Sequence, residues 1–350
     1  MVTSIKQSKR IVFGIDTFGD LPKDDNGKLL SHAAAIRQVI DEAVLADTLG
    51  IDVIALGEHH REDFSISSPE TVLAGIATKT KAIRLSSGVT VLSSDDPVRV
   101  FERFSTLDAL SNGRAEVMLG RGSFTESFPL FGYDLKDYEV LFEEKIALFA
   151  EILKEKPVTW SGTARPELKD ADIFPKTESG TLRTSVGVGG SPQSVIRAAH
   201  YGFPLMLAII GGNPARFAPY VELYRQAMDQ YGHKVDEIGM HSHGFIAETD
   251  EEAMKIMWPA HKTNFDRIGR TRGWPPMSRE QFDDEVKNGS LYVGSPETVA
   301  QKIATSIKTL GIDRFDLVYG SGPMPASARL AMIELYATKV IPRVRELLDA

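Results

Sequence analysis

Three adjacent residues, Glu58, His59 and His60, carry side chains that can exchange protons or bind metals. They follow a short apolar run that ends at Leu56. Histidine changes charge near neutral pH, so one of the two histidines could act as a general acid or base. Neighbouring side chains at an extended strand end point to opposite sides and cannot easily chelate one ion, so we predict no metal site. The alternative is a structural histidine that is satisfied by hydrogen bonds.

A second pair of histidines, His241 and His243, lies in an apolar run with one residue between them. On a strand this spacing places both side chains on the same face. A metal site would need a third ligand, and none is evident in the sequence. We therefore interpret the two residues as a hydrogen-bonded pair in the wall of the fold.

Arg121 stands between Gly120 and Gly122, just after another apolar run. A guanidinium matches the oxygens of a phosphate or carboxylate, and the flanking glycines let a ligand approach closely. The alternative is a salt bridge at the rim of the fold. Arg114 precedes the same run, so we expect it at the opposite, stabilising end.

The segment Gly189-Gly190-Ser191-Pro192-Gln193-Ser194 has the pattern of a helix start. Free backbone N–H groups and the helix dipole favour an anion such as phosphate at such a place. The alternative is a simple turn followed by an N-cap. A dinucleotide-binding fingerprint is not completed, because the third glycine and the acidic residue of the next strand are missing.

These candidates are positioned by elements that alternate between strand and helix. Short apolar runs rich in β-branched residues predict strands, and runs with helical spacing predict helices. The predicted strands are residues 11–18, 52–56, 83–88, 115–119, 184–188, 205–210, 238–247 and 314–319. The predicted helices are residues 33–49, 69–80, 97–111, 138–154, 192–201, 215–231, 296–310 and 326–348.

Eight strand–helix units predict a single α/β domain over residues 1–350, folded as a (β/α)8 TIM barrel. Near-continuously apolar strands indicate burial on both faces, which parallel pairing with helical crossovers provides. Two stretches, 157–182 and 260–292, do not fit the repeat and are predicted to be insertions after barrel strands. The active site of such a barrel lies at the carboxyl ends of the strands, where the Glu-His-His, Arg121 and Gly-Gly-Ser-Pro segments fall.

The composition is that of an ordinary globular protein, with 350 residues of which 42% are hydrophobic and 25% are charged. The net charge of -8 gives no general attraction to nucleic acid or to anionic membranes. The absence of cysteine excludes disulfides, zinc–thiolate sites, iron–sulfur clusters and thiol nucleophiles. The N-terminus is polar and basic with no apolar stretch behind it, so we expect a cytoplasmic protein.

Taken in order along the chain, several segments resemble those of the bacterial luciferase-like flavin monooxygenases. The matching segments span nearly the whole chain and are Ile54-Ala-Leu-Gly-Glu-His-His60, Leu92-Ser-Ser-Asp-Asp-Pro-Val-Arg99, Leu107-Asp-Ala-Leu-Ser-Asn-Gly-Arg114, Met118-Leu-Gly-Arg-Gly-Ser123, Leu130-Phe-Gly-Tyr-Asp134, Gly189-Gly-Ser-Pro-Gln-Ser194, Tyr201-Gly-Phe-Pro204, Val293-Gly-Ser-Pro-Glu297 and Leu310-Gly-Ile-Asp313. The resemblance implies a (β/α)8 barrel, assembled as a homodimer, that binds reduced FMN supplied by a separate reductase. It further implies that molecular oxygen forms a peroxyflavin, which oxygenates a small organic substrate.

The resemblance also implies roles for individual residues. His59 matches the family histidine beside the flavin, which is proposed as a base. Gly88 and Val89 match a place where relatives have a non-proline cis peptide bond under the flavin ring. The residues expected to bind the phosphate end of the cofactor are Arg121, Ser123, Gly190, Ser191 and Ser194.

The chain departs from luciferase at three places in this region. Glu139 stands where luciferase has a second phosphate-side arginine, and Gly190 stands where it has an acidic residue. Gly120 replaces the cysteine beside the flavin. We therefore do not expect long-chain aldehyde specificity or light emission.

Two other functions are compatible with the same motifs. The first is a deazaflavin-dependent hydride-transfer oxidoreductase of the same superfamily, which shares the barrel and the phosphate region but uses no oxygen chemistry. The Glu-His-His element favours FMN over this alternative. The second is a flavin-binding protein without turnover, and the presence of His59 weighs against it.

Overall fold

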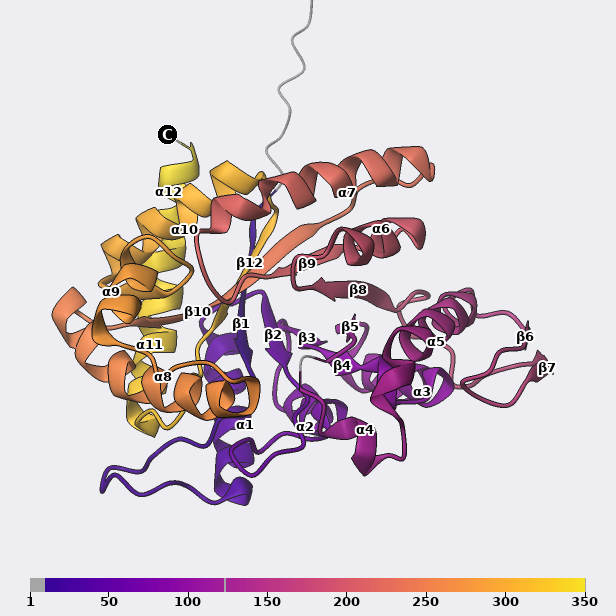
Figure 1. Cartoon of the computed structure of the whole chain (residues 1–350), viewed down its shortest axis with the longest axis horizontal. Coiled ribbons are helices and arrows are strands. Elements are labelled where there is room, and N and C mark those ends of the chain that lie inside the picture. The colour runs from indigo at the N-terminus through magenta and orange to yellow at the C-terminus, as the bar shows by residue number, and fades with distance from the viewer. Residues whose placement is uncertain (1–9, 123, 350) are drawn as a thin grey trace, which may run out of the picture.

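Eight parallel strands close into a barrel in the computed structural model, which describes residues 10–122 and 124–349 (Figure 1). In the order of their pairing around the barrel, the strands are β1 (Val12–Thr17), β2 (Val53–Leu56), β3 (Arg84–Ser87), β5 (Ala115–Gly120), β8 (Arg183–Val188), β9 (Leu205–Ala208), β10 (Ile238–Ile246) and β12 (Arg314–Val318). β12 pairs with β1 and so closes the ring. Each of these strands lies within or close to one of the eight predicted runs, and the predicted (β/α)8 barrel is confirmed.

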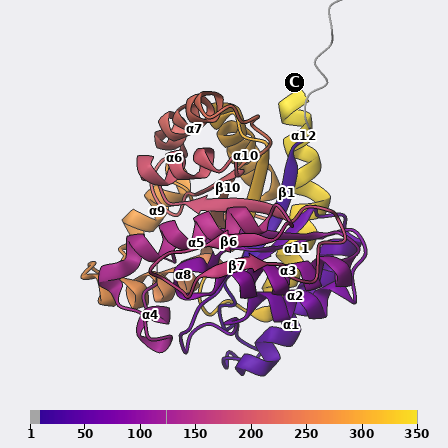
Figure 2. The same ribbon diagram turned by 90° about the vertical axis from the view of Figure 1, so that its right-hand side faces the viewer.

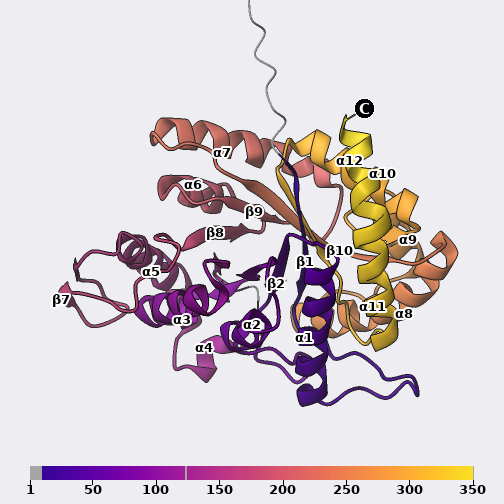
Figure 3. The same ribbon diagram turned by 180° about the vertical axis from the view of Figure 1, so that it is seen from behind.

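Helices cover the outside of the barrel on all sides, as the views from the front and from behind show (Figures 1 and 3). They are α1 (His32–Thr48), α2 (Pro69–Ala77), α3 (Pro97–Ser111), α5 (Tyr138–Ile152), α6 (Pro192–His200), α7 (Ala218–Gln230), α10 (Pro296–Leu310), α11 (Ala326–Leu335) and α12 (Ile341–Asp349). A π-helical turn, Tyr336–Val340, joins the last two, which together form the predicted helix 326–348. Within the described residues, no helix is long and apolar enough to cross a lipid bilayer.

The helix starts follow the pattern of a polar residue before proline. The side chain of Asp96 caps α3 by accepting from the backbone N–H groups of Val98 and Arg99, and Ser295 caps α10 in the same way. Such a cap satisfies backbone donors that the first helical turn leaves unpaired. These caps therefore fix the residues at which α3 and α10 begin.

A buried network of charged side chains, here called the ionic floor of the barrel, lies in the barrel interior. Arg314 on β12 is fully buried and lies 2.7 Å from both Asp316 and Glu116. Burial alone would raise the pKa of Glu116, but the charges of Arg314 and Arg84 outweigh it and lower that pKa to about 2. The strand periodicity predicts only apolar burial and does not reveal this network.

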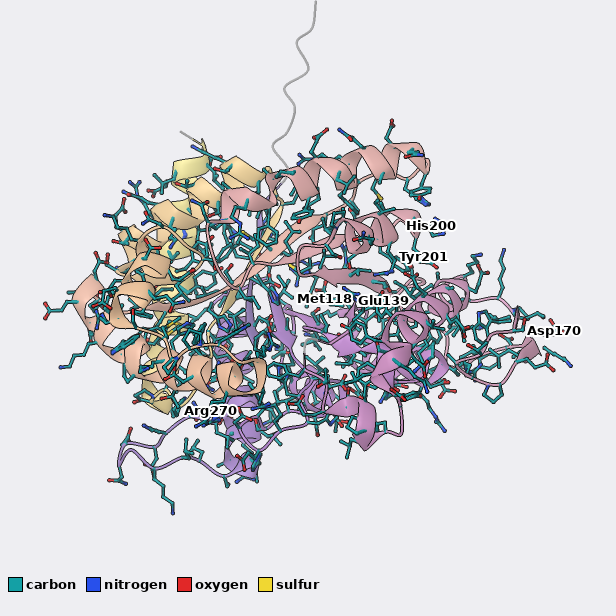
Figure 4. All side chains as sticks on the ribbon, in the orientation of Figure 1. Met118, Glu139, Asp170, His200, Tyr201 and Arg270 are labelled. Atoms are coloured by element: carbon teal, nitrogen blue, oxygen red, sulfur yellow. The ribbon has the colours of Figure 1, made fainter. Side chains whose placement is uncertain are left out.

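Two excursions depart from the repeat, as expected. Residues 157–182 form an antiparallel hairpin of β6 (Val158–Trp160) and β7 (Leu168–Ala171), which projects from the barrel beside α5 (Figures 1 and 2). This stretch connects α5 to β8, so it leads into a barrel strand instead of following one, which differs from the prediction. Figure 4 labels Asp170 at the outer end of the hairpin.

The second excursion is largely helical. It contains α8 (Asp250–Arg272) and α9 (Arg279–Lys287) and returns through β11 (Tyr292–Gly294). α8 begins earlier than the predicted boundary at residue 260, because Thr249 caps it and three acidic residues occupy its first turn. The excursion follows β10, so it stands at the carboxyl ends of the strands, where the candidate site lies.

Candidate functional site

The floor of the site is built from small residues at the carboxyl ends of the strands. The peptide bond between Gly88 and Val89, just after β3, is cis, as the resemblance implies. A Cβ atom on Gly120 would lie 2.4 Å from the Val89 side chain, and one on Gly187 would lie 2.8 Å from it. These approaches leave no room for a larger residue at either position. The cysteine that luciferase has at the place of Gly120 would therefore displace Val89.

The loop after β8 is open at Gly189, which is exposed. Apart from its chain neighbours, no described heavy atom lies within 4 Å of the position that a Cβ on Gly189 would occupy. Gly190 has a φ of 102°, which favours glycine, and Ser191 follows it as the N-cap of α6. The hydroxyl of Ser191 accepts from the backbone N–H of Ser194 and lies 2.8 Å from the hydroxyl of Ser194. The predicted helix start is confirmed, and both serines lie at this end of α6.

Two arginines converge on this helix start. Arg121 donates to the hydroxyl of Ser194 at 3.2 Å and lies over the ring of Tyr138. Arg197 on α6 donates to the same hydroxyl at 3.4 Å, and its side chain is only 8% exposed. Arg121 is also ion-paired with Glu139, so the salt-bridge alternative is confirmed, and a phosphate role stays a prediction. Ser123 lies outside the described residues.

The sequence analysis missed Arg197. Its side chain is ion-paired with Glu143 and Glu139, both on α5, and it lies over the ring of Phe142. A residue three positions after Ser194 on a helix lies on the same face, and that spacing was a usable signal. Figure 4 labels Glu139 on the α5 side of the barrel. Arg197 on α6 thus lies beside Glu139 on α5.

His59 lies in a cage of aromatic rings. The centroid of its ring is 5.3 Å from that of Phe18, 4.3 Å from that of Phe64 and 4.7 Å from that of Phe124. Neither ring nitrogen has a hydrogen-bond partner among the described residues. Burial lowers the pKa of His59 to about 3, so the ring is neutral at physiological pH. A histidine satisfied by hydrogen bonds is therefore not what the structure shows at this position.

The His60 side chain contacts Glu58 and has a structural role. It lies 2.9 Å from one oxygen of Glu58, while the other Glu58 oxygen accepts from the backbone N–H of Val91. Glu58 thereby ties the loop after β2 to the segment that follows the Gly88–Val89 bond. Among the described residues, no group of three or more histidine or acidic side chains is placed to hold a metal ion.

His241 and His243 share the inner face of β10 but do not form the pair that we predicted. Nδ1 of His241 lies 2.7 Å from Oδ2 of Asp16 on β1. His243 instead packs against the rings of Phe18 and His261. Burial is the main cause that lowers the pKa of His243 to about 3. An acidic partner from β1 was not foreseen, because 225 residues separate Asp16 from His241.

Arg114 lies where the sequence placed it, at the amino end of the barrel. Its guanidinium donates to the backbone carbonyl of Ile83 at 2.7 Å and to those of Ala77 and Thr80 at 3.1 Å. These bonds connect the loop before β5 with the end of α2 and the start of β3. Arg114 is therefore a structural residue, and Arg121 at the other end of β5 belongs to the candidate site.

Comparison with known proteins agrees with this geometry. The alkanal monooxygenase alpha chain of Photorhabdus luminescens is 24% identical, over 90% of this chain and 93% of its own. The limonene 1,2-monooxygenase of Rhodococcus erythropolis is 27% identical, over 88% of this chain and 81% of its own.

Solved structures share the whole fold. The monooxygenase RslO1 from Streptomyces bottropensis superposes with a TM-score of 0.81 at 26% identity and covers 95% of this chain and 99% of its own. The oxygenating constituent of 3,6-diketocamphane monooxygenase from Pseudomonas putida, in complex with FMN, has a TM-score of 0.78 at 19% identity, over 96% and 99% of the two chains. The coenzyme F420 dependent tetrahydromethanopterin reductase of Methanopyrus kandleri has a TM-score of 0.70 at 20% identity, over 96% and 99%.

The sequence profile described as luciferase-like monooxygenase matches residues 17–314, which include every strand-end segment discussed above except the last loops. The barrel, the cis peptide bond between Gly88 and Val89 and the two serines at the start of α6 are all features that the resemblance implies. On the strength of that match, the chain belongs to the luciferase-like monooxygenase family.

Proposed function

We propose that this protein is an FMN-dependent monooxygenase, an oxidoreductase that uses reduced FMN and molecular oxygen to oxygenate a small organic substrate. One observation carries the proposal. Two arginines and two serines meet at the start of α6, where they offer donors for an anion beside a floor of glycines that larger residues would fill. A flat ring that bears a phosphate is the kind of ligand that such a combination accommodates.

The residues present fit this cofactor. Arg121, Arg197, Ser191 and Ser194 would hold the phosphate, since guanidinium groups, hydroxyls and the first N–H groups of a helix all bind phosphate oxygens. The Gly88–Val89 segment would lie under the ring. When bound, reduced FMN supplies the two electrons with which molecular oxygen is activated.

The chain itself would control water and protons around the ring. The cage formed by Phe18, Phe64 and Phe124 keeps water from His59 and favours an apolar part of a substrate. His59 is neutral, with two unpaired nitrogens, so it can accept a hydrogen bond or a proton from a group brought into the cage. Burial makes the imidazolium unfavourable, so a proton taken up at Nδ1 or Nε2 would be passed on readily.

The proposal is tested by mixing the purified protein with chemically reduced FMN and air, and by following the return of oxidised flavin absorbance. We expect reoxidation to be slower than that of free reduced FMN, because the bound ring is shielded from water. The R121Q/R197Q double variant is the control and should reoxidise flavin at the free rate. Reoxidation at the free rate by the unmodified protein would contradict the proposal.

A deazaflavin-dependent hydride-transfer oxidoreductase is the second candidate. Its support is the similarity of fold to the F420-dependent reductase, because the phosphodiester of a deazaflavin cofactor could use the same arginines. Competitive titration with FMN and a deazaflavin cofactor distinguishes the two. A preference for the deazaflavin, with no effect of oxygen on turnover, would select this alternative.

A flavin-binding protein without turnover is a third possibility, and the H59A variant addresses it. If His59 takes part in oxygenation, H59A binds FMN but loses oxygenation activity.

We also propose a separate reductase as the donor of reduced FMN and a homodimer as the assembly, both on the basis of the resemblance. Light scattering of the purified protein measures the assembly directly.

A further inference from the structure

We propose that His241, held by Asp16, is a second proton-transfer residue of the site, and that Asp16 is its positioning residue. This inference rests on the proposed function, because the proton would pass between His241 and a bound flavin or its substrate. It assigns a role to two residues that lie outside the arginine and serine cluster at the start of α6 and outside the aromatic cage of His59.

The geometry places the pair at the centre of the barrel. Asp16 on β1 is fully buried, and its Oδ2 lies 2.7 Å from Nδ1 of His241 on β10. Both Asp16 oxygens lie 3.1 Å from the position that a Cβ on Gly88 would occupy. The carboxylate is therefore directly beneath the peptide segment that would support the ring.

The His241 ring lies beside the aromatic cage of His59. The His241 side chain is 6% exposed while that of Asp16 is 0% exposed, so the imidazole is the part of the pair that reaches accessible space. His241 also meets the ring of Phe18 edge-on at 6.2 Å, and Phe18 stacks on His59. The contact with Asp16 uses Nδ1, so Nε2 is the ring nitrogen with which His241 could meet a ligand.

A carboxylate on one imidazole nitrogen changes what the other nitrogen can do. It fixes the tautomer and the orientation of the ring, and it stabilises the imidazolium that forms when Nε2 accepts a proton. His59 has no such carboxylate on its ring nitrogens, and burial lowers its pKa to about 3. Of these two histidines, His241 is thus the one whose ring is oriented by an acidic side chain.

Charged side chains surround the pair. Burial raises the pKa of Asp16, and the hydrogen bond and charge of His241 oppose that rise. Asp316 on β12 adds negative charge and Arg314 beneath it adds positive charge, while His243 is the titratable neighbour on β10. The second oxygen of Asp16 has no hydrogen-bond partner, so no other donor competes with His241 for the carboxylate.

The first test uses nitrogen-15 NMR of histidine-labelled protein, without cofactor and then with oxidised FMN. H241Q identifies the His241 signals, and D16N should alter the Nδ1 signal by removing its partner. We expect added FMN to shift the Nε2 signal of His241. FMN binding with no change in that signal would overturn the inference while leaving the proposed function intact, whereas absence of FMN binding would contradict the proposed function itself.

The second test measures hydrogen peroxide formation from reduced FMN and oxygen in the absence of substrate. Anionic reduced flavin, oxygen and one proton give oxidised flavin and hydrogen peroxide, so the rate reports proton delivery. We expect H241Q to slow peroxide formation by about 100-fold at neutral pH, in the usual range for loss of an acid–base group. D16N should change the pH profile, because the imidazole loses the side chain that orients it.

H243Q is the matched control, since His243 lies on the same face of β10 without an acidic partner. It should bind FMN and give the unmodified pH profile. Thermal unfolding of each variant confirms that it is folded. Profiles of H241Q and D16N that coincide with that of the unmodified protein would overturn the inference.

Discussion

Arg121 and Arg197 donate to one and the same atom, the hydroxyl oxygen of Ser194, at 3.2 and 3.4 Å. One arginine comes from the loop after β5 and the other from α6, so two separate elements of the barrel are bound to one point. Both guanidinium groups are ion-paired with carboxylates, Arg121 with Glu139 and Arg197 with Glu139 and Glu143. An anion at the helix start would therefore compete with these carboxylates for the two arginines.

We predict that R121Q and R197Q each weaken FMN binding by roughly 10- to 100-fold, because a hydrogen bond to a charged group contributes about 1.5–3 kcal/mol. Isothermal titration calorimetry with FMN measures the change. Riboflavin, which lacks the phosphate, is the control ligand, and its affinity should change little. An equal loss for both ligands would mean that the arginines support the fold and do not contact the phosphate.

Replacing Glu139 should have the opposite effect. Its side chain is 61% exposed and paired with Arg121, so it competes with a phosphate for the guanidinium. We predict that E139Q binds FMN a few-fold more tightly at low salt, and that the gain shrinks as salt screens the charges. Titrations at two ionic strengths test this. Weaker binding by E139Q would show that the carboxylate orients Arg121 productively.

The buried histidines should make the protein sensitive to acid. Burial holds the pKa of His59 near 3, below its value of about 6.5 in the unfolded chain, so the unfolded state binds more protons between these two pH values. The free energy of unfolding should therefore fall as pH drops below about 6.5, by up to about 1.4 kcal/mol per pH unit for each such histidine.

H59F should reduce this dependence, because phenylalanine keeps the aromatic packing and cannot be protonated. Urea unfolding between pH 4 and 7 measures the slope, with the exposed His233 replaced in H233Q as the control. The raised pKa values of buried carboxyls such as Glu42 act in the opposite direction, so the informative quantity is the difference between variant and unmodified protein. A slope for H59F equal to that of H233Q would contradict the prediction.

The ionic floor of the barrel should be intolerant of a missing partner. R314M leaves Asp316 and Glu116 buried with too little positive charge, and removal of one partner from a buried ion pair costs about 3–5 kcal/mol. Chemical denaturation measures the loss. R343M removes an arginine that is paired on the surface with Glu297, and it should change stability by less than about 1 kcal/mol.

Two glycines of the mouth should respond differently to alanine. G120A forces a Cβ to within 2.4 Å of Val89 and should destabilise the fold by about 1–3 kcal/mol through overpacking. G189A places its Cβ in open space, so we expect unchanged stability but weaker binding of both FMN and riboflavin. Thermal unfolding and calorimetry separate the two effects. Unchanged affinity in G189A would show that the ligand does not occupy this space.

The barrel could be predicted because each strand is a short apolar run and several helices carry their own start signal. Ser191 and Ser295, each before a proline, show how local the signal is, since the side chain caps a helix that begins one residue later. The positions of Arg121 and Arg114 at opposite ends of β5 followed from chain direction alone.

The inner surroundings of the site could not be predicted in the same way. The rings around His59 come from loops after three different strands, and Asp16 meets His241 across the barrel. Such contacts depend on strand register and helix rotation, which no local pattern encodes. Arg197 was missed for the same reason, because the position of its side chain in the site depends on how α6 packs against α5.

The end of β10 pairs with β11, with Gly244 opposite Tyr292 and Ile246 opposite Gly294. The chain therefore leaves the barrel for α8 and α9 and re-enters beside its own point of departure. The intervening segment is also joined to the loop after β2 by the Arg267–Asp63 ion pair and to the loop after β9 by the Glu285–Gly212 hydrogen bond. A change within this segment would thus reach the loops at the ends of two other strands, while the pairing of the eight barrel strands stays the same.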